Sequence, residues 1–153
     1  MININVFSDE KAWTKKIKKK DIFFKKICKA FPKKYQFTNK KIFISLLLSN
    51  NRGIKKLNKQ FRNKNKPTDI LSFPFQDKFK LKDNSYLGDI IISYDFMNKS
   101  MSHKKNLFKE KVIKTFIHGF LHLLNFNHIK LKDYKKMFEE EQKIYRSVIS
   151  RIN

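Results

Sequence analysis

Cysteine is almost absent from this chain, which has only Cys28 among its 153 residues. A lone cysteine cannot form an internal disulfide, so the disulfide-stapled secreted domains are excluded and a reducing, cytoplasmic environment is expected. Cys28 lies at helical spacing from apolar residues such as Phe24 and Phe31. This pattern favours a buried, inert thiol over a catalytic one.

Long apolar runs are missing as well. No stretch approaches the roughly 18 apolar residues that a membrane-spanning helix requires. The first residues reach Asp9 and Glu10 without the apolar core of a signal peptide. We therefore expect a cytoplasmic protein that does not enter a membrane.

Acidic residues are few: 13 Asp and Glu stand against 36 Lys and Arg, and the formal net charge is +23. Such an excess favours a polyanionic partner, either a nucleic acid or an anionic membrane surface. A biased genomic base composition, which would also enrich the chain in Lys, Asn, Ile and Phe, explains the excess equally well. The charge by itself therefore favours a polyanionic partner but does not identify it.

Apolar material is plentiful, because 41% of the residues are hydrophobic and 16 of them are Phe. This content excludes wholesale disorder, and the length suits one hydrophobic core. The sequence shows no internal repeat and no linker of biased composition. We expect a single domain over residues 1–153.

The order of local patterns predicts the fold class. Residues 2–7 and 42–48 have the composition of strands, and helices are predicted from Ser8 or Asp9 to about Phe31 and over residues 51–62. Two further strands, over residues 69–74 and 87–93, flank a polar turn and can pair as a hairpin, and the chain is helical from Tyr94 onward. This order predicts an α/β (α+β) fold with a small, mixed four-stranded sheet packed with helices.

A metal site is predicted on a helix in the C-terminal half. Within the helix of residues 106–124, His118 and His122 project away from the apolar stripe and lie one turn apart, so both imidazoles can bind one ion. His128 can join them only if the chain reverses after the helix. Asn125 suits that reversal, because Asn readily adopts the left-handed conformation that ends helices.

Three imidazole ligands leave an open coordination position, as in catalytic zinc sites. An ion of this kind can polarise a phosphoryl oxygen or lower the pKa of a bound water. Zinc is the ion we expect, although three imidazoles also suit nickel, copper and iron. The alternative to a metal site is a chance cluster of histidines on a solvated face. His103 has no matching partner, and we expect it to be a surface residue.

Gly119 occupies the position where helix-borne zinc proteases carry their catalytic Glu, so peptide hydrolysis is disfavoured. Glycine also costs about 1 kcal/mol in a helix interior relative to Ala. Its presence indicates a close approach, either of substrate or of another element packed against the helix.

Several sequence blocks resemble those of the YbeY-type endoribonucleases, which are bacterial rRNA maturation factors. Residues 118–128, HGFLHLLNFNH, resemble the family signature H-G-x-L-H-L-x-G-Y-D-H. Residues 57–62, 67–74 and 87–93 resemble the blocks N-x-x-[YF]-R, T-D-V-L-S-F-P and L-G-D-I-x-I-S in the same order. With the compatible order of strands and helices outside these blocks, the resemblance covers nearly the whole chain.

The resemblance implies a mixed-sheet α/β fold, a zinc-like ion on His118, His122 and His128, and cleavage of single-stranded RNA. It further implies a role in maturation of the 3′ end of small-subunit (16S) rRNA and in ribosome quality control, with rRNA and the small ribosomal subunit as partners. Arg62 matches the family's functional arginine. A guanidinium there could hold a phosphate or stabilise its developing charge, and the alternative is a surface ion pair near a helix end.

Three positions in the histidine block differ from the family pattern. Asn125 replaces Gly, Phe126 replaces Tyr and Asn127 replaces Asp. The last two changes remove a hydroxyl and a carboxylate that could orient a ligand. Two other classes therefore stay open beside an RNA hydrolase: a non-catalytic RNA- or ribosome-associated factor with a structural metal, and a metal-dependent hydrolase of another substrate.

Overall fold

The computed structural model describes residues 1–75, 81–99 and 105–152. Its elements follow in the order β1 (Ile2–Ser8), α1 (Ala12–Lys16), α2 (Lys20–Lys29), a 3-10 turn (Lys33–Tyr35), β2 (Ile42–Ser49), α3 (Asn51–Arg62), β3 (Ile70–Pro74), β4 (Ser85–Ser93), α4 (Tyr94–Asn98), α5 (Lys105–Leu123) and α6 (Leu131–Ile152). His103, expected to be a surface residue, lies outside the described residues.

The four strands form one mixed sheet in the order β1-β2-β4-β3. The β1–β2 and β2–β4 pairs are parallel, whereas β3 runs antiparallel to β4 as the predicted hairpin. Pro74 ends β3 at the edge of the sheet, where the missing N–H group of a proline is tolerated. The predicted mixed four-stranded sheet is confirmed.

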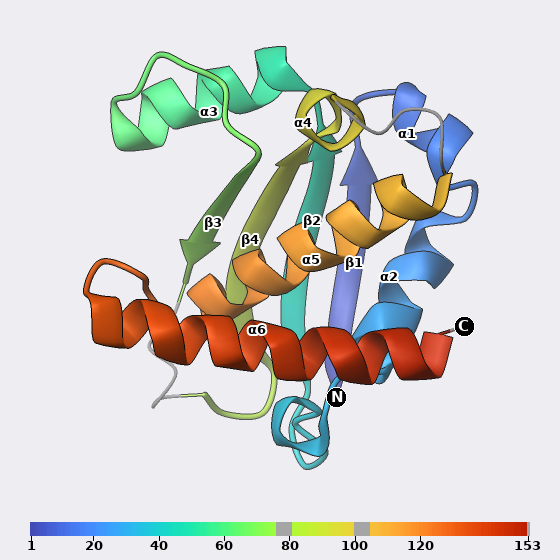
Figure 1. Cartoon of the computed structure of the whole chain (residues 1–153), viewed down its shortest axis with the longest axis vertical. Coiled ribbons are helices and arrows are strands. Elements are labelled where there is room, and N and C mark those ends of the chain that lie inside the picture. The colour runs from blue at the N-terminus through green and yellow to red at the C-terminus, as the bar shows by residue number, and fades with distance from the viewer. Residues whose placement is uncertain (76–80, 100–104, 153) are drawn as a thin grey trace.

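Strand β2 shows how the sheet separates two faces. Ile42, Ile44, Leu46 and Leu48 are fully buried, and the side chains that alternate with them through Leu47 are only half-buried. The buried set packs beneath α2 and α5, and α6 lies outside α5 (Figure 1). The other face carries α3 near its β3–β4 side (Figure 1). Most of the core therefore lies on one face of the sheet.

Aromatic side chains hold α5 to the rest of this core. The Phe116 ring lies 5.3 Å from the Phe24 ring, and the Phe120 ring lies 4.8 Å from the Phe31 ring, measured between centroids. All four are fully buried. Aromatic pairs at such distances add stability beyond that of the buried area alone. Helix α5, which carries two of the candidate metal ligands, is thus firmly anchored.

The single helix predicted from Ser8 or Asp9 to Phe31 is wrong, because the chain forms two helices separated at Ile17. Ile17 has an extended backbone (φ −132°, ψ 97°), and α2 begins only at Lys20. Five lysines between residues 15 and 20 would repel one another along a continuous helix. The break also leaves Trp13 free to donate its indole N–H to the Ser49 carbonyl at 2.8 Å.

The predicted N-terminal cap is also wrong. Helix α1 begins at Ala12, and neither Ser8 nor Asp9 caps it. Instead, the Glu10 carboxylate accepts a hydrogen bond from the Ala12 backbone N–H at 3.1 Å. The longer side chain of Glu reaches from two residues upstream to one of the unpaired N–H groups of the first turn.

Cys28 is buried, with 3% of its surface exposed. Burial raises the pKa of its thiol to about 12, so the thiol stays protonated at neutral pH. The sequence prediction of a buried, unreactive cysteine is confirmed. Among the described ranges 1–75, 81–99 and 105–152, no helix combines the length and the apolar character needed to cross a membrane.

Candidate metal centre

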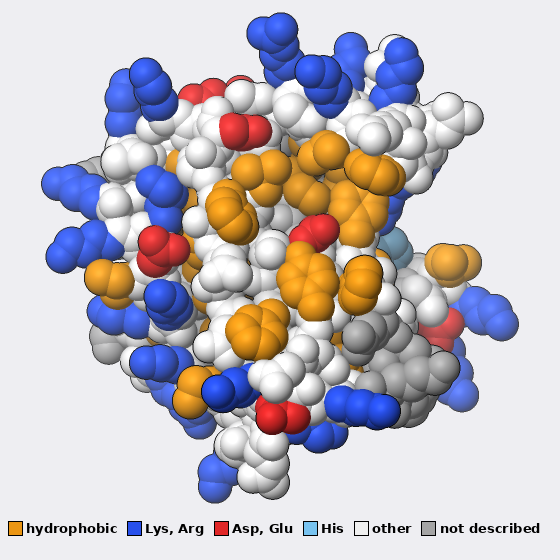
Figure 2. Space-filling model, turned by 180° about the vertical axis from the view of Figure 1, so that it is seen from behind, with side chains coloured by type: hydrophobic (Ala, Val, Ile, Leu, Met, Phe, Trp, Pro, Cys, Tyr) orange, Lys and Arg blue, Asp and Glu red, His pale blue; other side chains and the backbone are white. Residues whose placement is uncertain are grey.

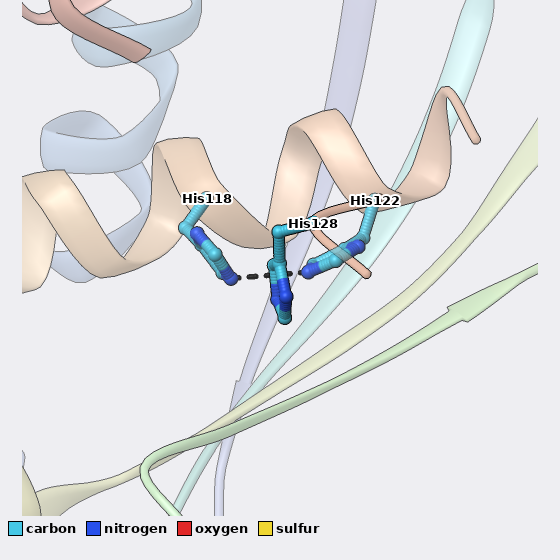
Figure 3. Close-up of side chains that lie close together, drawn as sticks. All are labelled: His118, His122 and His128. Carbon is cyan, nitrogen blue, oxygen red and sulfur yellow. Dashed lines mark hydrogen bonds between the residues drawn. The ribbon is translucent and has the colours of Figure 1, made fainter. Parts of the chain in front are cut away.

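His118 and His122 lie on the half-buried side of α5, one turn apart (Figure 3). Their Nε2 atoms approach to 3.0 Å and point toward the same space. Buried apolar residues occupy the other side of the helix, as the spacing predicted. One rigid element therefore fixes two nitrogen atoms at a separation that suits two ligands of a single ion.

The turn after α5 delivers the third histidine. Asn125 adopts the predicted left-handed conformation, with φ 66°. The Phe126 N–H donates to the Leu121 carbonyl at 3.1 Å and the Asn125 N–H to the His122 carbonyl at 2.9 Å, which is the Schellman pattern of a helix end. The chain thereby reverses and returns His128 to the other two histidines.

His128 is exposed, and its ring centroid lies 5.4 Å from that of His118 and 5.1 Å from that of His122. One ring nitrogen from each of the three residues lies within 4.8 Å of the others. The three histidines that the sequence singled out are thus brought together as a group that could hold a metal ion.

Hydrogen bonds behind the cluster set the tautomers of two of the three candidate ligands. The His118 Nδ1–H donates to the Glu141 carboxylate at 2.8 Å, and the His122 Nδ1–H donates to the Phe126 carbonyl at 2.9 Å. In the neutral rings, each Nε2 then carries a lone pair. Two lone pairs 3.0 Å apart repel each other unless a cation lies between them, so the donor set fits a metal ion.

The environment of His122 favours its neutral form. Burial lowers the pKa of His122 below the ordinary value of 6.5, and the nearby His118, His128 and Arg62 lower it further. The hydrogen bond to Phe126 opposes this shift but does not reverse it. Since only a neutral imidazole binds a metal, His122 could bind a metal ion at a lower pH than a free histidine can.

Glu141 is a site residue that the sequence reasoning missed. It lies on α6, 23 residues beyond His118, so no local spacing connects the two. A signal was present, however, because Glu141 continues the spacing of the buried residues Met137, Ile144 and Val148. A carboxylate within an apolar stripe needs a polar partner, and His118 provides it.

Arg62 ends α3 and lies in the same pocket as the histidines. The pocket has a volume of about 530 Å³, and its lining includes Arg62, the three histidines, Ser72 and Asn127. The guanidinium donates from Nη2 to the Ser72 carbonyl at 3.1 Å, and its Cζ lies 5.6 Å from the centroid of the Phe73 ring. No ion pair of Arg62 is found among the described residues, so the expected alternative of a surface ion pair is not what this part of the chain shows.

Gly119 is explained by packing between α5 and the sheet. A Cβ atom at this position would lie 2.5 Å from Ile70 Cδ1 and 2.9 Å from Ser72 Oγ. The Ser72 hydroxyl donates to the Gly119 carbonyl at 3.0 Å. Of the two approaches that the sequence allowed, the contact with another element is the one observed, and it brings α5 close to the edge strand.

The three positions that differ from the family signature have distinct surroundings. Asn125 makes the turn, and Phe126 supplies its backbone carbonyl to His122. The Asn127 side chain accepts a hydrogen bond from the Ile129 N–H at 3.4 Å. Helix α6 supplies, through Glu141, a carboxylate that orients His118, one of the candidate ligands.

The fold and the pocket together define a class of protein: a mixed-sheet α/β domain with a three-histidine site and a neighbouring arginine. The model of the family described as endoribonuclease YbeY matches residues 6–149. This chain belongs to the endoribonuclease YbeY family. Endoribonucleases are hydrolases that cut RNA, so the family and enzyme class expected from the sequence are confirmed.

Individual relatives agree with the family model. The chain is 59% identical over 152 residues to an endoribonuclease YbeY of Pelagibacter ubique, covering 99% of both chains. It is 40% identical over 128 residues to that of Ehrlichia ruminantium, covering 84% of this chain and 78% of the relative. The solution structure of TM1509 from Thermotoga maritima has the same fold, with a TM-score of 0.61, 24% identity and coverage of 95% and 89%.

Proposed function

We propose that this protein is a single-strand-specific, metal-dependent endoribonuclease that acts in maturation of the 3′ end of small-subunit (16S) rRNA and in ribosome quality control. It would work in the cytoplasm, as one domain over residues 1–153, on rRNA and the small ribosomal subunit. Its family, its net charge of +23 and its one buried cysteine support this proposal.

His118, His122 and His128 would hold one divalent transition-metal ion, for which zinc is our choice because three imidazoles with an open fourth position suit it. Such an ion supplies Lewis acidity toward a phosphoryl oxygen or a water molecule. The protein itself orients the two helix-borne ligands through Glu141 and the Phe126 carbonyl. It leaves the exposed His128 side of the pocket open to substrate.

Arg62 would bind the phosphate of the scissile linkage. The Ser72 carbonyl and the Phe73 ring hold the guanidinium in place, and only one of its five N–H donors is used in the bond to Ser72. A permanent cation fixed in this way stabilises negative charge that grows on the phosphate during cleavage. The observation that carries the proposal is that Arg62 and the three histidines line one pocket.

The test is cleavage of a single-stranded RNA and of the matching duplex by zinc-loaded protein, with His118→Ala and Arg62→Ala beside the wild type. We expect cleavage of the single strand only, and loss of cleavage in both variants while circular dichroism shows a folded chain. An intact single strand after incubation with the loaded wild type would contradict the proposal. RNA binding without cleavage, with unfolding on metal removal, would instead indicate a non-catalytic factor with a structural ion.

A further inference from the structure

The face of the sheet opposite α5 carries an apolar groove. Because Ser72 contacts Gly119 of α5, the alternating side chain of Phe73 lies on the other face of β3. The groove there has a volume of about 570 Å³ and is lined by Phe7, Ser45, Leu47, Leu57, Phe61, Phe73, Asp89, Ile90 and Ile91. Figure 2 shows apolar side chains gathered in this hollow, with Lys and Arg side chains around the margin of the same face.

Aromatic rings in and beside this groove are unusually open to solvent. Phe7 is 57% exposed, Phe61 60% and Phe75 69%. The Phe61 ring lies 5.4 Å from the Phe73 ring, and the Phe75 ring lies 5.6 Å from that of Tyr86. Rings exposed on a sheet, with cations at the margin of the same face, are the features by which proteins stack the bases of single-stranded nucleic acids.

The groove adjoins the candidate metal centre through Arg62. The guanidinium lies over the Phe73 ring, which lines the groove, and Arg62 also lines the pocket of the three histidines. Phe61, the residue before Arg62, presents its ring to the groove. A strand whose phosphate lies at Arg62 can therefore continue around the edge strand β3 with its next bases in the groove.

Asp89 places a negative charge in the groove. Its carboxylate lines the groove and is hydrogen-bonded by the Tyr86 hydroxyl. An anion repels phosphate but accepts hydrogen bonds from base amino groups. The charges thus place the phosphates at the cationic margin and the bases over the apolar floor, where Asp89 would receive N–H donors.

We propose that this groove binds unpaired bases of the RNA that enters the metal centre. The inference rests on the proposed function and extends it, because it assigns the preference for a single strand to stacking on Phe61, Phe73 and Phe7. Bases already stacked in a duplex cannot occupy the groove. The rings recognise the faces of the bases and Asp89 recognises their N–H donors, whereas the phosphate is recognised separately by Arg62.

The test compares two short labelled RNA strands of equal length, one with all its bases and one with abasic sites in its centre. Binding to the full chain is measured in the presence of a chelator, so that the strand is not cut. Phe61→Ala and Phe7→Ala should each weaken binding of the complete strand about tenfold and leave the abasic strand unaffected. Phe61→Tyr, which keeps a ring, and Phe138→Ala, an exposed ring outside both pockets, should bind as the wild type does.

Equal affinity of the wild type for both strands, or an unchanged affinity of Phe61→Ala for the complete strand, would overturn the inference. Unchanged RNA affinity together with a lower sedimentation coefficient of concentrated Phe61→Ala would assign the groove to contact between copies of this chain, which also overturns it. Cleavage of single-stranded RNA by the zinc-loaded wild type is scored separately. The binding test can therefore contradict base binding in the groove while RNA cleavage supports the proposed function, and the opposite pair of results can also be recognised.

Discussion

Removing the Glu141 carboxylate should weaken metal binding at the three histidines. Glu141 accepts a hydrogen bond from His118 Nδ1–H at 2.8 Å. This bond holds the ring with Nε2 toward the site and makes Nε2 a stronger metal ligand. Loss of such a partner behind a metal ligand typically costs 10- to 100-fold in affinity. The two side chains are 25% and 30% exposed, so solvent partly screens their interaction. We therefore expect Glu141→Ala to lie near the lower limit, about tenfold.

A pair of substitutions separates charge from geometry. Glu141→Gln keeps an oxygen that can accept the same hydrogen bond but removes the negative charge, so its loss of zinc affinity should be smaller than that of Glu141→Ala. Glu139→Gln, an exposed neighbour on the same helix, provides the matched control. Zinc affinity is measured by competition with a chromophoric chelator, and circular dichroism verifies the fold. Wild-type zinc affinity in Glu141→Ala would refute the assignment.

Three further predictions follow from the same site. Arg62→Ala should abolish most RNA cleavage and leave zinc content and thermal unfolding near normal. An equal loss of zinc would show that the assignment of Arg62 to the phosphate is wrong. Gly119→Ala should lower the free energy of unfolding by about 1 kcal/mol. Overpacking against Ile70 and Ser72 costs about 1–3 kcal/mol, and the better helix propensity of Ala offsets about 1 kcal/mol of this cost. An unchanged Tm would show that the sheet moves to make room for the added methyl group. The metal-free protein should lose stability as the pH falls from 6.5 through the lowered pKa of His122, since the unfolded chain binds the proton first. His122→Gln should flatten that part of the urea-unfolding profile, and an equally steep profile would mean that other groups cause it.

The sequence was sufficient for features that depend on local chemistry. Strand composition and helical periodicity located the four strands and the helix that bears His118 and His122, and the left-handed preference of Asn located the turn at Asn125. Each of these follows from interactions within a few residues. They are also the features that place the three histidines in order, so most of the candidate site could be predicted.

Features that depend on packing between distant segments were not predictable in the same way. The break at Ile17 interrupts a pattern of apolar residues that a continuous helix would also satisfy, and the side chain of Trp13 finds its partner, Ser49, 36 residues away. Glu141 reaches His118 only because α6 packs on α5. Helical periodicity indicates that a face is buried, but it does not say which element buries it.

The division of the site between α5, the following turn and α6 has a consequence for the dynamics of the C-terminal third. His118 and His122 belong to one helix, His128 to the turn, and Glu141 to the other helix. An ion held by the histidines would join α5 to the turn, and the hydrogen bond from His118 to Glu141 would connect α6 to the same site, so ion binding would favour the docked arrangement of α6. Metal occupancy and the opening of α6 are then thermodynamically linked. Amide hydrogen exchange in α6 should slow as zinc is added, so the exchange rate of this helix would measure the metal occupancy of the site.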